Sequence, residues 1–187
     1  TPGITVFGMA FLTLFSATLI ARDRESALLQ RLYTTPLAGP DFIFGYLLSL
    51  LPIALGQVVL CYLFAIPLGL TVSSNILYAV LGILPMAVFN IGLGLLCGSL
   101  LGVKQVCGIC GALLSNLSAW LSGVWFDLEL VGGAFKKAAD FLPFLHAVEL
   151  EKAAINGNFS EIFPHIVFVS GYAVLVAACA VILFLKQ

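Results

Sequence analysis

The chain has 187 residues, of which 61% are hydrophobic and 9% are charged, and its mean hydropathy is +1.15. Soluble domains carry about 25% charged residues, so this composition excludes an ordinary soluble domain and indicates an integral membrane protein. The formal net charge is −1 and the basic residues form no stripe, which argues against a nucleic-acid partner.

Five apolar segments are long enough to cross a membrane, which takes about 20 residues of helix. They are residues 3–21, 42–70, 76–101, 107–126 and 162–185. Lipid offers the backbone no hydrogen-bond partners, so the predicted fold is an all-α polytopic bundle of about five transmembrane helices in one domain. The opening Thr1-Pro2-Gly3 carries neither Met nor a signal-peptide pattern, so we expect a further span before residue 1 and six in the complete domain.

The basic residues between the spans predict how the chain is oriented. One set of alternate loops holds five of them: Arg22, Arg24, Arg31, Lys104 and Lys186. The other side holds only Lys136, Lys137 and Lys152, diluted by five acidic residues. Because basic loops stay in the cytoplasm, residues 22–41 and the C-terminus are predicted to be cytoplasmic and residues 127–160 external.

The loop at residues 22–41 has the pattern of a short amphipathic helix. Asp23 and Glu25 lie in its first turn and Arg31 near its end, an order that suits the helix dipole. Leu28 and Leu32 share one face of that helix. From these residues alone two roles stay open, which are contact with another subunit and an anchor that lies along the lipid headgroups.

The same loop carries a motif close to the pattern E-R-E-x-G-T-L-E-x-L-x-x-T-P-L of ABC-2 type permeases. Identical or conservative matches occur at Asp23, Arg24, Glu25, Leu29, Leu32, Thr35, Pro36 and Leu37. Departures occur at Ala27, Leu28 and Gln30. The Pro2-Gly3 opening and residues 122–126 and 142–147 are also similar to that family. The chain therefore resembles an ABC-2 permease over nearly its whole length.

The resemblance implies that the transport pathway and the ATP-binding site belong to different subunits. Two permease chains, identical or different, would pair, and each would place its loop helix in a groove of a separate ATP-binding subunit of an exporter. The residues implied at that contact are Arg24, Glu25, Leu28, Arg31, Leu32, Thr35 and Pro36. The chain has no G-x-x-x-x-G-K-[ST] motif, so ATP and Mg²⁺ are expected in the partner subunit, and this chain is expected to be no enzyme and to hold no cofactor. The expected location is the inner or plasma membrane of a prokaryote.

The apolar cores of the five segments contain no Asp, Glu, Lys or Arg. Ion-coupled carriers keep such groups at a cost of roughly 2.5–3.5 kcal/mol each, so their absence argues against ion-gradient coupling and favours an amphipathic, lipid-like or drug-like substrate. The candidates for lining a pathway are Gln57, Asn90, Asn116 and Ser118, and interhelical hydrogen bonding is their alternative role. Gly92, Gly94, Gly98 and Gly102 lie at close spacing in and directly after the third segment and predict a tight helix contact.

Residues 127–160 are too polar to span the membrane. Two short helices are predicted there, near residues 131–140 and 144–156, the second ended by Gly157. The side chains expected to dip into the outer leaflet around Pro143 are Phe135, Phe141, Leu142 and Phe144. In the resembled family this region is a re-entrant hairpin, which implies a role for Phe141, Pro143, Phe144 and His146. An external lid and a cap that only seals the bundle both stay open.

Two other function classes are a membrane-embedded enzyme and a membrane scaffold. A membrane-embedded enzyme would need clustered His or carboxylates, but the chain has only His146 and His165 and no H-E-x-x-H motif. Cys107 and Cys110 form a C-x-x-C with no further ligands near them, so we interpret them as packing residues and predict no metal site. A membrane scaffold or assembly protein without transport is the alternative that the sequence leaves open.

Overall fold

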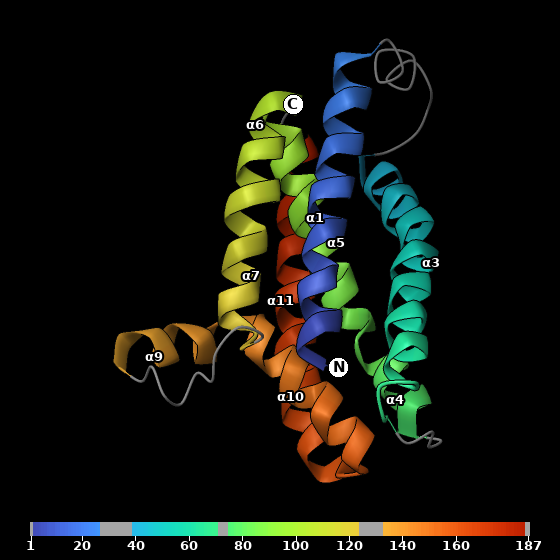
Figure 1. Cartoon of the computed structure of the whole chain (residues 1–187). Coiled ribbons are helices and arrows are strands. Elements are labelled where there is room, and N and C mark those ends of the chain that lie inside the picture. Colours follow the sequence, from blue (N-terminus) through green and yellow to red (C-terminus); the bar gives the residue numbers. More distant parts are fainter. Residues whose placement is uncertain (1, 27–38, 71–74, 124–132, 186–187) are drawn as a thin grey trace.

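The structure, a computed structural model, describes residues 2–26, 39–70, 75–123 and 133–185. Within these ranges the chain is helical and forms no strand (Figure 1). In chain order the helices are α1 (Pro2–Glu25), α3 (Gly39–Ala65), α4 (Asn75–Gly82), α5 (Leu84–Leu100), α6 (Val103–Val106), the π-helix η1 (Cys107–Leu114), α7 (Ser115–Leu121), α9 (Gly133–Phe141), α10 (Pro143–Asn156) and α11 (Phe159–Leu185).

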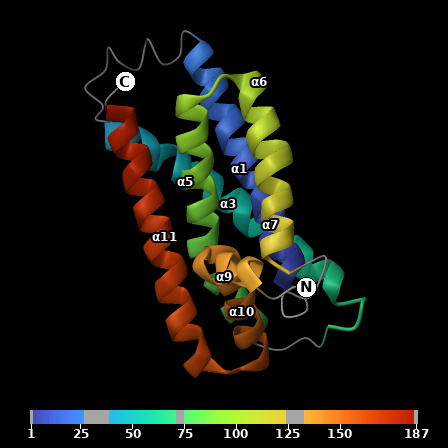
Figure 2. The same cartoon turned by 90° about the vertical axis from the view of Figure 1, so that its left-hand side faces the viewer.

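Four helical stretches of the described chain are long and apolar enough to cross a membrane: Pro2–Glu25, Pro40–Ala65, Asn75–Leu100 and Phe159–Leu183. They run side by side along the long axis of the bundle (Figures 1 and 2). This arrangement confirms the predicted polytopic helical bundle. The fifth expected span corresponds to the consecutive helices α6, η1 and α7, which follow the same axis but are individually short. Residues 124–126 lie outside the described part, so a fifth span stays a prediction.

Helices α1 and α5 pack closely because α5 carries glycines on the contact face. A Cβ atom on Gly94 would lie 1.9 Å from Ser16 Oγ, and one on Gly98 would lie 2.3 Å from the Ala17 carbonyl oxygen. The Thr13 hydroxyl adds a contact of 3.0 Å with the Asn90 side-chain oxygen. The predicted tight contact is confirmed at Gly94 and Gly98, which make α1 and α5 one packed unit, whereas Gly92 faces Val176 of α11 and Gly102 has no close neighbour of this kind.

The third span is broken, and the fourth apolar segment is locally unwound. Ile83 separates α4 from α5, and Pro85 lies in the first turn of α5, where its missing N–H is tolerated. In η1, the Ser115 hydroxyl donates to the Cys110 carbonyl five residues earlier, at 3.2 Å. The glycines Gly108 and Gly111 lie within this π-helix, a form that departs from the regular α-helical ladder.

The two predicted short helices are present as α9 and α10. Gly157 ends α10 with a positive φ of 77°, a conformation that glycine adopts without strain. α9 projects sideways at one end of the bundle, and α10 lies against α1, α4 and α11 (Figures 1 and 2). Phe141 is 70% exposed, as expected of a side chain that dips into lipid.

The expectation for Phe144 was wrong. Its side chain is only 5% exposed and packs edge-to-face on Phe89, with ring centroids 5.9 Å apart. Because α10 folds back onto the bundle, Phe144 lies on the helix face that points into the protein core. Pro143 is also buried, at the start of α10, and the Phe135 side chain lies outside what the structure describes.

Candidate functional site

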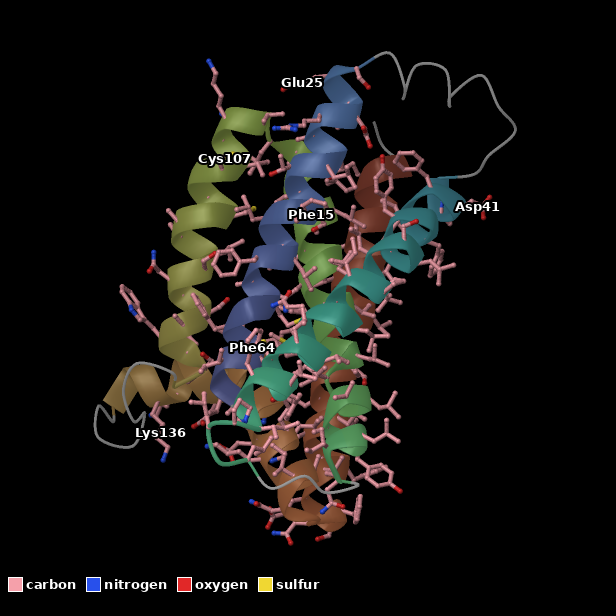
Figure 3. All side chains as sticks on the ribbon, turned by 45° about the vertical axis from the view of Figure 1, so that its right-hand side comes forward. Phe15, Glu25, Asp41, Phe64, Cys107 and Lys136 are labelled. Carbon is pink, nitrogen blue, oxygen red and sulfur yellow. The ribbon has the colours of Figure 1, made fainter. Side chains whose placement is uncertain are left out.

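The last turn of α1, where the predicted cytoplasmic loop begins, contacts three other helices. The Tyr46 hydroxyl of α3 donates to the Asp23 carboxylate. Arg24 donates to the Gly98 carbonyl at 3.1 Å and also to the Ser99 carbonyl, both in the last turn of α5. We call Asp23, Arg24 and Glu25 the loop root. Figure 3 shows Glu25 at the same end of the bundle as Asp41 and Cys107, with Lys136 at the opposite end.

The Arg24 contact fits the electrostatics of a helix end. The last carbonyls of an α-helix have no intrahelical partner and carry partial negative charge, so a guanidinium is favourable there. Since α1 and α5 are also joined by the close approach at Gly94 and Gly98, Arg24 extends their packing to the very end of both helices.

Glu25 connects the loop root to the fourth apolar segment. Its Oε1 accepts a long hydrogen bond of 3.4 Å from the backbone N–H of Val103, the first residue of α6. η1 follows α6 directly. The loop root therefore touches α3, α5 and α6 through three consecutive side chains.

An open groove of about 420 Å³ lies beside the loop root, between α1 and the first turns of α3. It is lined by Leu19, Asp41, Phe42, Gly45, Tyr46 and Ser49. Its walls are mostly apolar, with the Asp41 carboxylate at one side. Such a groove has the size and polarity to accept an apolar side chain or part of a lipid chain.

The remaining residues expected at the ATPase contact cannot be placed. Leu28, Arg31, Leu32, Thr35 and Pro36 lie outside the described residues. Of that set, the structure describes Arg24 and Glu25 alone, and it shows both in contacts within the chain. Their contact with an ATPase stays a prediction.

The four candidates for lining a pathway are spread over α3, α5 and α7. Asn90 is buried; its side-chain oxygen contacts Thr13 and joins α5 to α1, while its amide donates to the Met86 carbonyl of its own helix at 2.9 Å. Gln57 is half-buried beside Gly8 of α1. Asn116 is exposed and bonds to Ala112 of its own helical stack, whereas Ser118 is buried. A role for these residues in transport stays a prediction.

At the end of the bundle opposite the loop root, α10 is tied to α11 through histidines. His146 Nδ1 and His165 Nδ1 are 2.9 Å apart, and His146 Nε2 is 2.8 Å from the Asp140 carbonyl. A carbonyl only accepts, so His146 must donate through Nε2, and its Nδ1 must accept from His165 when both rings are neutral. His146 therefore lies in a hydrogen-bonded chain that joins α9, α10 and α11.

Glu151 is a buried residue that the sequence alone does not single out, since it is one of the five acidic residues of the predicted external side. This side chain is 0% exposed, and its Oε2 lies 2.5 Å from the Thr5 hydroxyl of α1. Burial raises the pKa of Glu151 to about 8, and the neighbouring hydroxyls of Thr5 and Tyr62 offset part of the rise. One available signal was helical spacing, because Glu151 lies four residues after Ala147 and three before Ala154, on the apolar face of α10.

The described residues contain no group of three His, Cys, Asp or Glu side chains that could hold a metal ion. In the C-x-x-C, Cys107 is exposed and Cys110 is buried, and both are free thiols.

Comparison with known proteins identifies the family. The family model described as ABC-2 type transporter matches residues 1–154. Neither a curated protein nor a solved structure matches the chain. The matched region covers most of the chain, including the loop root, α3, α5 and most of α10. The chain therefore belongs to the ABC-2 type transporter family, as a membrane domain of an ABC transporter.

Proposed function

We propose that this chain is the permease half of an ATP-driven exporter and that it receives mechanical work from a separate ATP-binding subunit. The family supports a permease role, and the contacts of the loop root support a route by which work enters the helices. ATP and Mg²⁺ would bind in the partner subunit. A second permease chain, identical or different, would complete the pathway.

The observation that carries the proposal is the Arg24 contact with the end of α5. A force applied to residues 22–41 reaches Arg24 directly, and Arg24 holds the Gly98 and Ser99 carbonyls. Because α1 and α5 are closely packed at Gly94, a shift of the loop root moves both helices together. Closely packed helices transmit such shifts because packed interiors resist continuous deformation.

Two smaller contacts would divide the motion among other helices. Tyr46 couples Asp23 to α3, and Glu25 couples to α6 and thus to η1. π-helical turns often occur at functional sites, and η1 offers a place where the fourth apolar segment changes shape. The substrate class that we propose is amphipathic, lipid-like or drug-like, since the apolar cores of the predicted spans lack ionisable carboxylates, ammonium and guanidinium groups.

The test uses the complete protein reconstituted with its cognate ATP-binding subunit. We expect Arg24→Ala to leave the complex intact and ATP hydrolysis measurable, but to lower substrate moved per ATP roughly tenfold, the scale of one lost charge-assisted hydrogen bond. Arg22→Ala is the matched control, since Arg22 is exposed in the same turn. Unchanged transport per ATP in Arg24→Ala would overturn the proposed route, and failure of the wild-type chain to bind any ATP-binding subunit would favour a scaffold.

A further inference from the structure

The carboxyl group of Glu151 is buried at the junction of three helices. It lies on α10, contacts Thr5 of α1 across 146 residues of chain, and acts electrostatically on Cys61 and Tyr62 of α3. Its side chain is among the largest fully buried ones in the described chain. Buried carboxyl groups are rare unless they are paired, so this position calls for a specific role.

The hydrogen-bond geometry around Thr5 indicates which form of the acid fits. The Thr5 oxygen lies 2.6 Å from the Pro2 carbonyl and 2.5 Å from Glu151 Oε2. A hydroxyl has one proton, so Thr5 can fully donate to only one of these two acceptors at a time. Both contacts are satisfied at once when Glu151 is protonated, because it can then donate its own proton to the Thr5 oxygen while Thr5 donates to Pro2.

The other oxygen of the carboxyl group leads to the same form. Glu151 Oε1 and the Tyr62 hydroxyl are both buried, and neither makes a close hydrogen bond, although Tyr62 is near enough to favour the charged form of Glu151 in part. A neutral carboxyl group tolerates one weakly satisfied carbonyl-type oxygen, whereas a buried carboxylate oxygen without a partner is far more costly.

The described charged groups near α10 offer Glu151 no counter-ion. Cys61 and Tyr62 of α3 face it, and both would carry negative charge if ionised. On α10 itself, Lys152 is exposed and paired with Glu149 at 2.9 Å.

The other elements packed on α10 bring their own titratable groups. Those on α9 are Lys136, Lys137 and Asp140; the one on α4 is Tyr78; and those on α11 are Glu161, His165 and Tyr172. Of these, His165 and the Asp140 carbonyl are engaged with His146. None of them is among the groups that set the charge state of Glu151, which burial dominates.

We propose that Glu151 is a proton-binding site. Its neutral form keeps α10 packed on α1 and α3, which we call the seated state, and its ionisation releases α10 from these helices. Its ligand is a proton taken up from the side of the membrane that α10 faces. Seating is then a pH-dependent property of the helix that lies across the end of the bundle opposite the loop root.

The direction of the pH effect follows from the pKa values of the two states. In the seated state the pKa of Glu151 is about 8, against an ordinary value of 4.5 when the group is released into water. Because the seated state binds its proton more tightly, seating is strongest below the ordinary value and weakens as the pH rises toward 8. Between these two pH values the equilibrium constant between seated and released α10 changes by up to about tenfold per pH unit.

Two measurements on the complete protein in lipid nanodiscs test the site without an ATPase. The first is infrared spectroscopy, in which a protonated buried carboxyl group gives a carbonyl stretching band. We expect that band at about pH 7 in wild type, its loss in Glu151→Gln, and its retention in Glu149→Gln. Glu149 is the matched control because it lies on the same helix but is exposed and paired with Lys152.

The second measurement is hydrogen exchange of peptides that cover α10, corrected for the intrinsic pH dependence of exchange. We expect protection of wild type and Glu149→Gln to fall by up to about tenfold per pH unit up to about pH 8. Glu151→Gln should stay protected and independent of pH, because an amide mimics the neutral acid. Thr5→Val should lower protection at acidic pH.

An infrared band that persists in Glu151→Gln, or corrected exchange of Glu151→Gln that follows the wild-type pH dependence, would overturn the proposal. Because neither readout involves ATP or transport, the proton site can fail while the proposed permease function stands, and the reverse also holds.

Discussion

Glu25 and Glu151 show how differently the two ends of the bundle treat a carboxyl group. Glu25 is exposed, and it accepts a hydrogen bond from a helix N-terminus at 3.4 Å. Glu151 is 0% exposed and contacts a hydroxyl that already has an acceptor for its proton. Water solvates the first group, whereas burial favours the neutral form of the second.

The difference indicates separate tasks for the two ends. The loop root uses charged side chains to hold the ends of helices, an arrangement suited to transmitting force from another subunit. The α10 end contains a buried acid and a histidine pair, and the hydrogen bonds of both depend on which side chains carry a proton. The glycine-mediated contact of α1 with α5 connects the two regions.

The largest expected effect is a loss of stability when the contact between α1 and α5 is disrupted. In Gly94→Val the new side chain would meet Ser16 Oγ at 1.9 Å and the Thr13 carbonyl at 2.4 Å. Since part of this clash is with backbone, we expect a loss of about 4 kcal/mol or more of stability, measured as the thermal or denaturant stability of the purified protein. Gly171→Val, at a mid-helix glycine with open space around it, should change stability far less. Equal stabilities of the two variants would contradict close packing of α1 on α5.

The second effect is the pH dependence of stability. Because the pKa of Glu151 is raised from 4.5 to about 8 in the folded protein, its contribution is complete below the lower value and is lost as the pH rises to the upper one. We expect wild type to lose about 1 kcal/mol of stability per pH unit relative to Glu151→Gln over this range. Chemical unfolding of both variants at several pH values measures the difference. A constant difference between the two would argue against a neutral Glu151.

Asn90 and Asn116 separate structural from functional roles among the predicted pathway residues. Asn90→Ala should cost about 1 kcal/mol of stability because it removes the buried side-chain contacts with Thr13 of α1 and Met86 of α5, while the Thr13 hydroxyl keeps the Asn90 backbone carbonyl as a partner. Asn116→Ala should change stability by no more than about 0.5 kcal/mol, since Asn116 is exposed. Transport assays on both variants complete the comparison. A stable Asn116→Ala protein with impaired transport would support a pathway role for Asn116, and normal transport would remove it from the list.

The smallest effect is expected at Tyr46 of α3, which contacts the loop root through Asp23. Tyr46→Phe removes only the hydrogen bond to Asp23, so we expect a loss of no more than about 1 kcal/mol of stability and a modest decrease in transport per ATP. Tyr78→Phe, at a largely exposed tyrosine of α4, is the control. If the two variants cannot be told apart, the Asp23–Tyr46 contact does not contribute to coupling.

Local patterns predicted much of the fold. Apolar length predicted the spanning helices, Gly157 predicted the end of α10, and Gly94 and Gly98 predicted a close helix contact. The family motif predicted the importance of the loop at residues 22–41, and a family match now supports the family assignment itself.

Long-range packing is what the sequence did not reveal. Phe144 and Glu151 lie in a polar segment, so both were assigned to the membrane surface or an external loop, but α10 folds back and buries them against α1, α3 and α5. The partner of Arg24 was missed for the same reason, since Gly98 and Ser99 are more than 70 residues away in the chain. Contacts of this kind depend on how helices dock, and helical periodicity alone does not specify it.

The most direct test of the proposed function is co-purification of the complete protein with its ATP-binding subunit, followed by ATP hydrolysis and transport in nanodiscs. Glu25→Lys reverses a charge at the loop root, and Glu149→Lys makes the same change at the opposite end. We predict that wild type and Glu149→Lys form an active complex, whereas Glu25→Lys inserts normally but loses assembly or coupled transport. Normal coupled transport by a well-expressed Glu25→Lys protein would contradict a role of the loop root in coupling.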